Sequence, residues 1–211
     1  GLVDAGIRKI RLTGGEPLIR KNILWLVEQL GALEGLDELT LTTNGSQLTA
    51  QAESLRRFGV SRINISIDSL QAEKFKSITR TGQLQQVLDG IDAAIEAGFE
   101  NIKLNSVILK HRNDDEVLDL VDFARRKKID IAFIEEMPLG NIIEHDRELA
   151  FFSSDEARKL IDKEFGLNES DKKTNGPSRY YSLKNSQTHV GFISPHSHNF
   201  CGDCNRIRVT V

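Results

Sequence analysis

The sequence predicts an α/β fold in which parallel strands alternate with helices. Five runs rich in β-branched and aliphatic residues recur at residues 9–13, 38–43, 62–68, 101–109 and 130–137. The stretches between them carry apolar residues at helical spacing, as in Ile19, Ile23, Leu26, Leu30 and Leu33, and each gives one apolar face. This alternation implies right-handed helical crossovers between parallel strands, in either a barrel or an open doubly wound sheet.

Polar residues on the predicted strands favour the barrel. Buried parallel strands are normally continuous apolar runs, whereas here polar side chains recur with a period of two and share one face of each strand. One alternative gives them local roles, with Asn44-Gly45 as a turn and Asp68 or Ser69 as a helix cap. All five strands together favour a polar ligand at a barrel mouth, where such barrels carry their active sites. The sets are Arg11 and Thr13; Thr42 and Asn44; Asn64, Ser66 and Asp68; Lys103 and Asn105; and Glu135 and Met137.

Two helix starts carry the sequence signature of a capping box, in which a short polar side chain and a glutamate three residues later each accept a backbone N–H. The first pair is Asn113 with Glu116, and the second is Ser153 with Glu156. We therefore expect helices to begin at both places.

The alternation ends near Pro138. After it we predict one amphipathic helix over 153–165, a polar surface loop over 168–178, and β runs over 188–193 and 206–211 that could pair antiparallel. We expect two domains, a partial (β/α) barrel over residues 1–140 and a small α+β region over residues 141–211.

Composition excludes several classes of protein. Hydrophobic residues at 39%, charged residues at 28% and a mean hydropathy of -0.32 are typical of a soluble globular chain. No apolar run approaches membrane-spanning length. A net charge of -3 and a pI near 6.0 give no general attraction for nucleic acid, so any polyanion site must be a local cluster of arginine and lysine.

The turn after the first strand suits a cationic ligand. Gly14 and Gly15 allow close approach to the backbone that a Cβ would block, and Pro17 fixes the next φ angle. Backbone carbonyls and the Glu16 carboxylate can then face an ammonium group.

Cys201 and Cys204 are the only cysteines, and their spacing suits one metal centre. Two thiolates complete neither a zinc site nor an iron–sulfur cluster. His196 and His198 would complete a Cys2His2 zinc site, whereas a third cysteine beyond Val211 would complete a cluster. A redox pair and an incidental pair are further alternatives.

Arg206 and Arg208 alternate on the last predicted strand, so both guanidinium groups would face one side and match phosphate oxygens. No aromatic residues interleave with them, and the chain is acidic overall, so a nucleoside triphosphate is favoured over a nucleic acid. Arg11 and Lys103 would add positive charge from the barrel. The simpler interpretation of each is a solvated surface cation.

Several motifs together resemble the MoaA family of radical S-adenosylmethionine (SAM) enzymes, the GTP 3',8-cyclases of molybdenum cofactor biosynthesis. The resemblance covers residues 6–211 and implies an incomplete TIM-like (β/α) barrel of radical SAM type. The motifs are KIRLTGGEPLIR at residues 9–20, TTNG at 42–45, SID at 66–68, KLN at 103–105, FIEEMP at 133–138 and FCGDCNRIRVT at 200–210.

Site residues carried over from this resemblance fall into three groups. Two cysteines, Cys201 and Cys204, would bind a C-terminal 4Fe-4S cluster whose third cysteine follows residue 211. The SAM contacts implied are Gly14, Gly15, Glu16, Ser66 and Met137. The substrate contacts implied are Arg11, Thr42, Lys103, Arg206, Ile207 and Arg208.

The family also has a CxxxCxxC motif that binds the SAM-cleaving 4Fe-4S cluster, and it would lie before residue 1. We therefore expect this chain to be an excerpt of a protein with two such clusters, inactive by itself.

The reaction implied is that of a lyase. A SAM-derived radical abstracts hydrogen from C3' of GTP, and the ribose radical attacks C8 of guanine, giving (8S)-3',8-cyclo-7,8-dihydroguanosine 5'-triphosphate. The resemblance further implies a reducing electron donor, a downstream cyclic pyranopterin phosphate synthase, a homodimer and a cytoplasmic location, with no nucleic acid or membrane as partner. Two alternatives are a radical SAM enzyme that modifies a peptide and a zinc-stabilised nucleotide-binding module.

Overall fold

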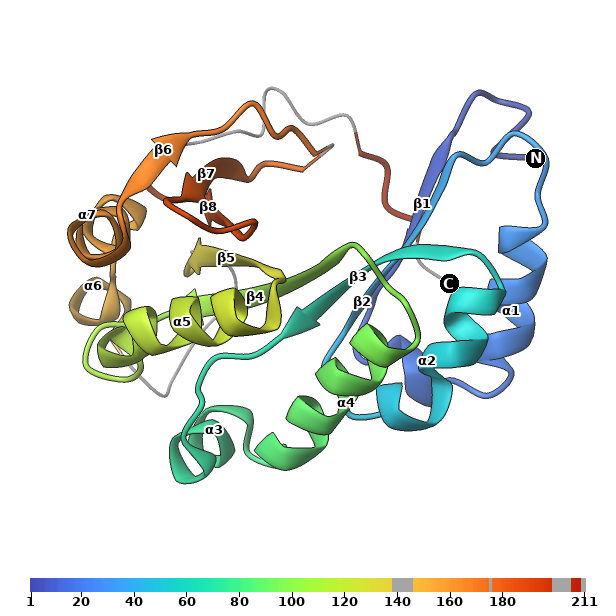
Figure 1. Ribbon diagram of the computed structural model, residues 1–211. Helices are drawn as coiled ribbons and strands as arrows, with labels where there is room; N and C mark the ends of the chain where they lie inside the picture. The colour runs from blue at the N-terminus through green and yellow to red at the C-terminus, as the bar shows by residue number, and fades with distance from the viewer. Residues whose placement is uncertain (138–145, 175, 199–205, 210–211) are drawn as a thin grey trace. The chain divides into compact units, whose positions relative to one another are not determined.

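The computed structural model describes residues 1–137, 146–174, 176–198 and 206–209 (Figure 1). The chain forms two compact units, residues 1–106 and residues 107–211. The units divide at residue 106, whereas the domains expected from the sequence divide at residue 140; that domain division stays a prediction.

The first unit is a parallel βα arrangement, and all its strands were expected from the sequence. Its strands pair in the order β1, β2, β3, β4, each parallel to the next. The elements are β1 (Lys9–Leu12), η1 (Pro17–Ile19), α1 (Ile23–Gly31), β2 (Glu38–Thr43), α2 (Leu48–Arg57), β3 (Val60–Ser66), α3 (Ala72–Thr79), α4 (Leu84–Glu96) and β4 (Ile102–Ile108), the last of which runs into the second unit.

One face of these strands is apolar and covered by helices. Leu41, Ile63, Ile65 and Leu104 are fully buried on it, and Figure 1 shows α1, α2 and α4 gathered on one side of β1–β3. Burial of such side chains is worth roughly 1.5–3 kcal/mol each. Because strand side chains alternate between faces, the polar residues between them must lie on the opposite face.

Gly90 sets how closely α4 packs on the turn that follows β2. A Cβ at this position would lie 2.3 Å from the carbonyl oxygen of Gly45. Only glycine therefore allows α4 to lie directly against that turn.

The second unit begins with helical elements and ends in a mixed set of strands. Its strands follow the order β5, β8, β7, β6, with β8 parallel to β5 and the other pairs antiparallel. The elements are η2 (Asp114–Glu116), α5 (Val117–Lys127), β5 (Asp130–Glu135), α6 (Arg147–Ala150), α7 (Ser154–Phe165), β6 (Leu167–Glu169), β7 (Arg179–Leu183) and β8 (His189–Ile193).

The helix expected over residues 153–165 is confirmed, and its capping box is present. Ser153 Oγ accepts the Glu156 backbone N–H at 3.2 Å, and Glu156 Oε2 accepts the Ser153 N–H at 3.1 Å. The capping box at Asn113 is wrong. There the Asn113 carboxamide instead binds the backbone at the end of β4: it accepts the Leu109 N–H at 2.8 Å and donates to the Val107 carbonyl oxygen at 2.9 Å.

The strand expected at the end of the chain is also wrong over its described part, because residues 206–209 have no regular structure. Both edges of β8 are already paired, one with β5 and the other with β7. The β7 strand itself was not predicted, and β6 occupies the start of the expected polar loop.

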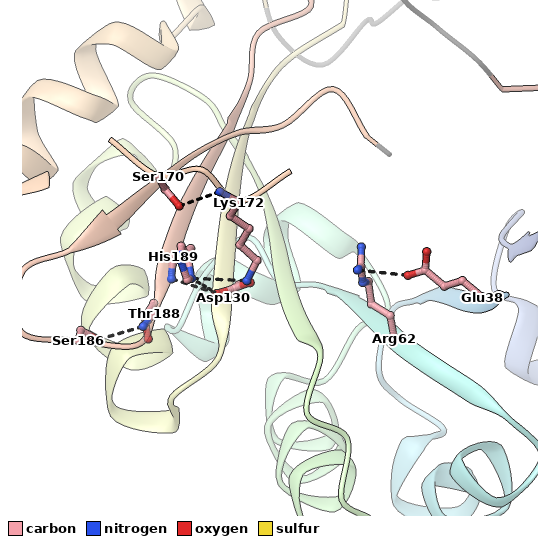
Figure 2. Close-up of polar contacts among 8 residues, drawn as sticks. All are labelled: Glu38, Arg62, Asp130, Ser170, Lys172, Ser186, Thr188 and His189. Carbon is pink, nitrogen blue, oxygen red and sulfur yellow. Dashed lines mark hydrogen bonds and ion pairs between the residues drawn. The ribbon is translucent and has the colours of Figure 1, made fainter. Parts of the chain in front are cut away.

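A polar cluster anchors that loop to the first residue of β5 (Figure 2). Lys172 Nζ lies 2.5 Å from Asp130 Oδ2, and the His189 backbone N–H donates to Asp130 Oδ1 at 3.0 Å. One carboxylate thus joins β5, the start of β8 and the segment after β6.

Glu135 performs a similar task at the other end of β5. Its side chain is buried, and it accepts the backbone N–H groups of Ser154 at 2.8 Å and Ser197 at 2.9 Å, together with the Ser197 hydroxyl. The carboxylate joins the start of α7 to the turn after β8. Local donors therefore occupy the Glu135 carboxylate, and the expectation that Glu135 and Met137 share an inward polar face stays a prediction.

We predict that Glu135→Gln destabilises the full-length protein at neutral pH by about 1–3 kcal/mol, since one carboxylate acceptor is replaced by a donor. Burial raises the pKa of Glu135, but hydrogen bonds from Ser154 and Ser197 outweigh it and leave the pKa below the ordinary value of 4.5. A lowered pKa contributes stability that is present above 4.5 and lost as pH falls through the folded-state pKa.

The difference in unfolding free energy between wild type and Glu135→Gln should therefore shrink on acidification, as measured by urea unfolding across pH. Glu164→Gln, at an exposed position of α7, is the control and should follow wild type. If the difference in unfolding free energy between wild type and Glu135→Gln were the same at all pH values, this role of the Glu135 carboxylate would be contradicted.

Candidate functional site

The GGEP turn (Gly14–Pro17) follows β1 and presents bare backbone. Gly14 has a φ of +149°, a conformation that side chains rarely adopt. A Cβ built on Gly14 or on Gly15 would meet no heavy atom of the described residues within 4 Å. The main chain of this turn therefore lies beside open space, as expected for a backbone that a ligand approaches closely.

Glu16 fastens the GGEP turn to the TTNG turn (Thr42–Gly45) after β2. Its Oε1 accepts the Leu18 N–H at 3.0 Å and the Thr43 hydroxyl at 2.7 Å, and its Oε2 accepts the Asn44 N–H at 2.6 Å. Because a carboxylate has about four acceptor positions, most of its capacity is used within the protein.

The Glu16 carboxylate therefore has structural partners, and the expectation that it also faces a ligand ammonium stays a prediction. The backbone of Gly14 and Gly15 is the open part of the turn, and Glu16 holds it in place. Thr43 was not predicted to take part; the available signal was the TTNG motif at the end of the adjacent strand.

The polar face of the first unit lies opposite the helices and is built in rows across the strands. At its base, Glu38 pairs with Lys9 at 3.1 Å and with Arg62 at 3.2 Å, and Figure 2 shows the second of these ion pairs. A register shift between Leu39 and Thr40 places Arg62 opposite Thr40. The face comprises Arg11, Thr40, Thr42, Arg62, Asn64, Ser66, Lys103 and Asn105.

The central row of this face contains two of the predicted substrate residues. Thr42 on β2 lies opposite Asn64 on β3, which lies opposite Lys103 on β4. Ser66 and Asn105 form the next row toward the carboxyl ends of the strands. The fold thus brings Arg11, Thr42, Ser66 and Lys103 onto one face, at the end of which the GGEP and TTNG turns meet.

The remaining predicted residues belong to the second unit, and their part in the site stays a prediction. Met137 follows β5 and is 50% exposed, and Arg206, Ile207 and Arg208 lie exposed in an irregular segment. Cys201 and Cys204 lie outside the described residues. Within the described part of the chain, no three His, Cys, Asp or Glu side chains are placed to hold a metal ion.

His196, one of the residues in the zinc alternative, has a local packing partner. Its ring lies 4.5 Å from that of Phe151, and its backbone N–H donates to Glu135 Oε2 at 3.2 Å. His196 is nevertheless exposed, and these contacts do not test the zinc alternative.

Residues 1–124 match the radical SAM superfamily. The chain belongs to the radical SAM superfamily. Residues 129–211 of this radical SAM chain match a second family, Molybdenum Cofactor Synthesis C.

Curated relatives extend the match over nearly the whole chain. GTP 3',8-cyclase from Ectopseudomonas mendocina (strain ymp) is 60% identical over 99% of the chain, and GTP 3',8-cyclase from Marinobacter nauticus is 58% identical over 99%. A protein named GTP 3',8-cyclase 2 from Pseudomonas aeruginosa is 56% identical over the same share. The chain spans 63% of the length of each of these relatives.

Solved structures confirm the fold expected from the sequence, an incomplete TIM-like α/β fold of radical SAM type. Streptococcus suis SuiB bound to S-adenosylmethionine matches with a TM-score of 0.62 at 17% identity, over 92% of this chain and 41% of that one. A radical SAM methyltransferase from Sphaerobacter thermophilus matches with a TM-score of 0.57 at 15% identity, over 75% of this chain and 49% of that one.

No helix in the described ranges combines the length and the apolar character needed to cross a membrane.

We predict that Glu16→Gln lowers the stability of the full-length protein by about 1–3 kcal/mol, because a carboxamide must turn its NH2 toward one of three N–H or O–H donors. Thermal or urea unfolding measures this loss. Thr43→Val removes one of the three hydrogen bonds and should cost less. A stability for Glu16→Gln equal to that of wild type would show that the two turns are held by other contacts.

Proposed function

We propose that this chain is part of a GTP 3',8-cyclase, a lyase that converts GTP to (8S)-3',8-cyclo-7,8-dihydroguanosine 5'-triphosphate in molybdenum cofactor biosynthesis. The observation that carries the proposal is 60% identity over 99% of the chain to a relative of that name. The polar face supports it, since a charged nucleotide needs cations and hydrogen-bonding groups inside a barrel that is otherwise apolar.

The GGEP turn fits the amino-acid part of SAM. Backbone carbonyls of Gly14 and Gly15 can accept hydrogen bonds from the methionine ammonium, because the space beside them is open. Glu16 would hold the turn in position, Ser66 would lie along the same cofactor and Met137 would contact its adenosine. When bound, SAM and its 4Fe-4S cluster supply the radical chemistry, and the protein supplies position and exclusion of water.

GTP would occupy the polar face. Arg11, Thr42 and Lys103 would contact it from the strands, and the segment Arg206–Arg208 would hold its triphosphate through bidentate guanidinium contacts. Cys201 and Cys204 would hold the second 4Fe-4S cluster, whose open iron would hold the guanine. The partners proposed are a reducing electron donor, a downstream cyclic pyranopterin phosphate synthase and a second copy of the protein, in the cytoplasm.

Anaerobic reconstitution of the full-length protein with iron, sulfide, SAM and GTP tests the function. We expect GTP to be consumed and the cyclised triphosphate to form. Cys201→Ala with Cys204→Ala should reduce bound iron and sulfide and abolish product. If the two cysteine substitutions remove zinc and leave iron and sulfide unchanged, the zinc-stabilised module is supported. If the wild-type protein modifies a peptide and does not convert GTP, the peptide-modifying enzyme is supported.

We predict that Arg206→Ala or Arg208→Ala weakens GTP binding by roughly tenfold, equivalent to about 1.4 kcal/mol, while SAM binding and cluster content are retained. Guanosine has no phosphates, so its affinity should change little. Equilibrium binding of GTP, guanosine and SAM to each variant makes the comparison. Equal losses for GTP and guanosine would contradict phosphate recognition by these arginines.

A further inference from the structure

Asn64 is a buried carboxamide whose NH2 group has a hydrogen-bond partner among the described residues and whose oxygen has none. It is 1% exposed, and its Nδ2 donates to Thr42 Oγ1 at 3.3 Å. Its Oδ1 accepts no hydrogen bond from the residues that the structure describes. An unpaired buried acceptor of this kind costs roughly 1–3 kcal/mol, so a purely structural role explains it poorly.

Asn105 on β4 also carries a buried carboxamide oxygen, but it belongs to the row of Ser66, a proposed SAM contact. Its Oδ1 is also buried without a donor among the described residues, and it lies in register with Ser66, one row beyond the row of Asn64 and Lys103. Two unpaired amide oxygens therefore lie on the same polar face of adjacent strands. The apolar face directly behind them, with Ile65 and Leu104, is fully buried.

The position of Asn64 indicates which ligand it meets. It lies between Thr42 and Lys103 in one cross-strand row, and both are proposed substrate contacts. An amide oxygen needs a donor, and a triphosphate at neutral pH offers acceptors. The sugar hydroxyls and the purine N–H groups are the donors that a nucleotide carries.

We propose that Asn64 accepts a hydrogen bond from the nucleoside half of the substrate and so orients it on the polar face. This inference rests on the proposed function, since it takes GTP as the substrate. Thr42 accepts a hydrogen bond from the Asn64 amide, so little ordering of this side chain is needed on binding. The Asn64 oxygen gains its donor when the nucleoside is bound.

Asn64→Leu provides the test, because leucine has a similar size and no polar atom. In the reconstituted full-length protein, we expect melting temperature to be unchanged or raised, since replacing an unsatisfied polar group by an apolar one is neutral or stabilising. GTP and guanosine should both bind roughly tenfold more weakly, while SAM affinity stays the same.

Ser106→Ala is the matched control. Ser106 is fully buried on β4, and its hydroxyl also has no hydrogen-bond partner among the described residues, but it follows Asn105 directly and so faces the opposite side of the strand. Its removal should leave the affinity for GTP and guanosine unchanged.

Analogues identify the donor. The affinity of 2'-deoxy-GTP, 3'-deoxy-GTP, inosine triphosphate and 1-methyl-GTP is measured on wild type and on Asn64→Leu. These analogues lack the 2'-hydroxyl, the 3'-hydroxyl, the 2-amino group and the N1–H, respectively. For at least one of the four, the loss caused by the substitution should largely disappear, because the group that meets Asn64 is already missing.

Four results would overturn the inference. The first is a lower melting temperature for Asn64→Leu with unchanged GTP affinity, and the second is an equal loss of SAM affinity. The third is a loss for GTP that vanishes with guanosine, which would mean that Nδ2 faces phosphate. The fourth is a loss that persists for all four analogues. Wild-type protein that binds no GTP would instead refute the proposed function, so the two failures are distinguishable.

Discussion

The arrangement of the candidate site depends on the Glu16 carboxylate. Its hydrogen bonds to Leu18, Thr43 and Asn44 join two turns whose residues are 27 and 28 positions apart in the sequence. These hydrogen bonds fix the GGEP turn, so that its glycine backbone can lie beside open space and still be ordered. A glycine-rich turn without such an anchor would have to be ordered by the ligand itself, at a cost in conformational entropy.

In the second unit, too, carboxylates join separate segments by accepting their hydrogen bonds. Asp130 at the start of β5 holds Lys172 and the backbone of His189, and Glu135 at the end of β5 holds Ser154 and Ser197. In each case one ionised group satisfies donors from two separate segments. Hydrogen bonds to a charged group are stronger than neutral ones, so a few acidic residues at strand ends fix loops that carry little apolar surface.

The polar face combines groups that stabilise the fold with polar groups that add no stability. Its base is closed by the ion pairs of Glu38, whereas the buried oxygens of Asn64 and Asn105 have no donor among the described residues. A fold selected for stability alone would place apolar residues at these two positions. The row of Thr42, Asn64 and Lys103 is consistent with the proposal that this surface receives a nucleotide.

Local pattern was enough to predict the strands of the first unit, the helix within residues 19–33, the helix over 153–165 and the face on which the polar residues of the first unit lie, because periodicity is a property of the chain itself. Tertiary structure alone decided which side chains meet. Thr42, Asn64 and Lys103 form one row only through strand register, and Glu16 finds its partners only when two turns come together. The strand expected at 206–211 failed over its described residues for the same reason. Its expected partner, β8, is already paired on both edges, and which strands flank β8 is set by the rest of the fold.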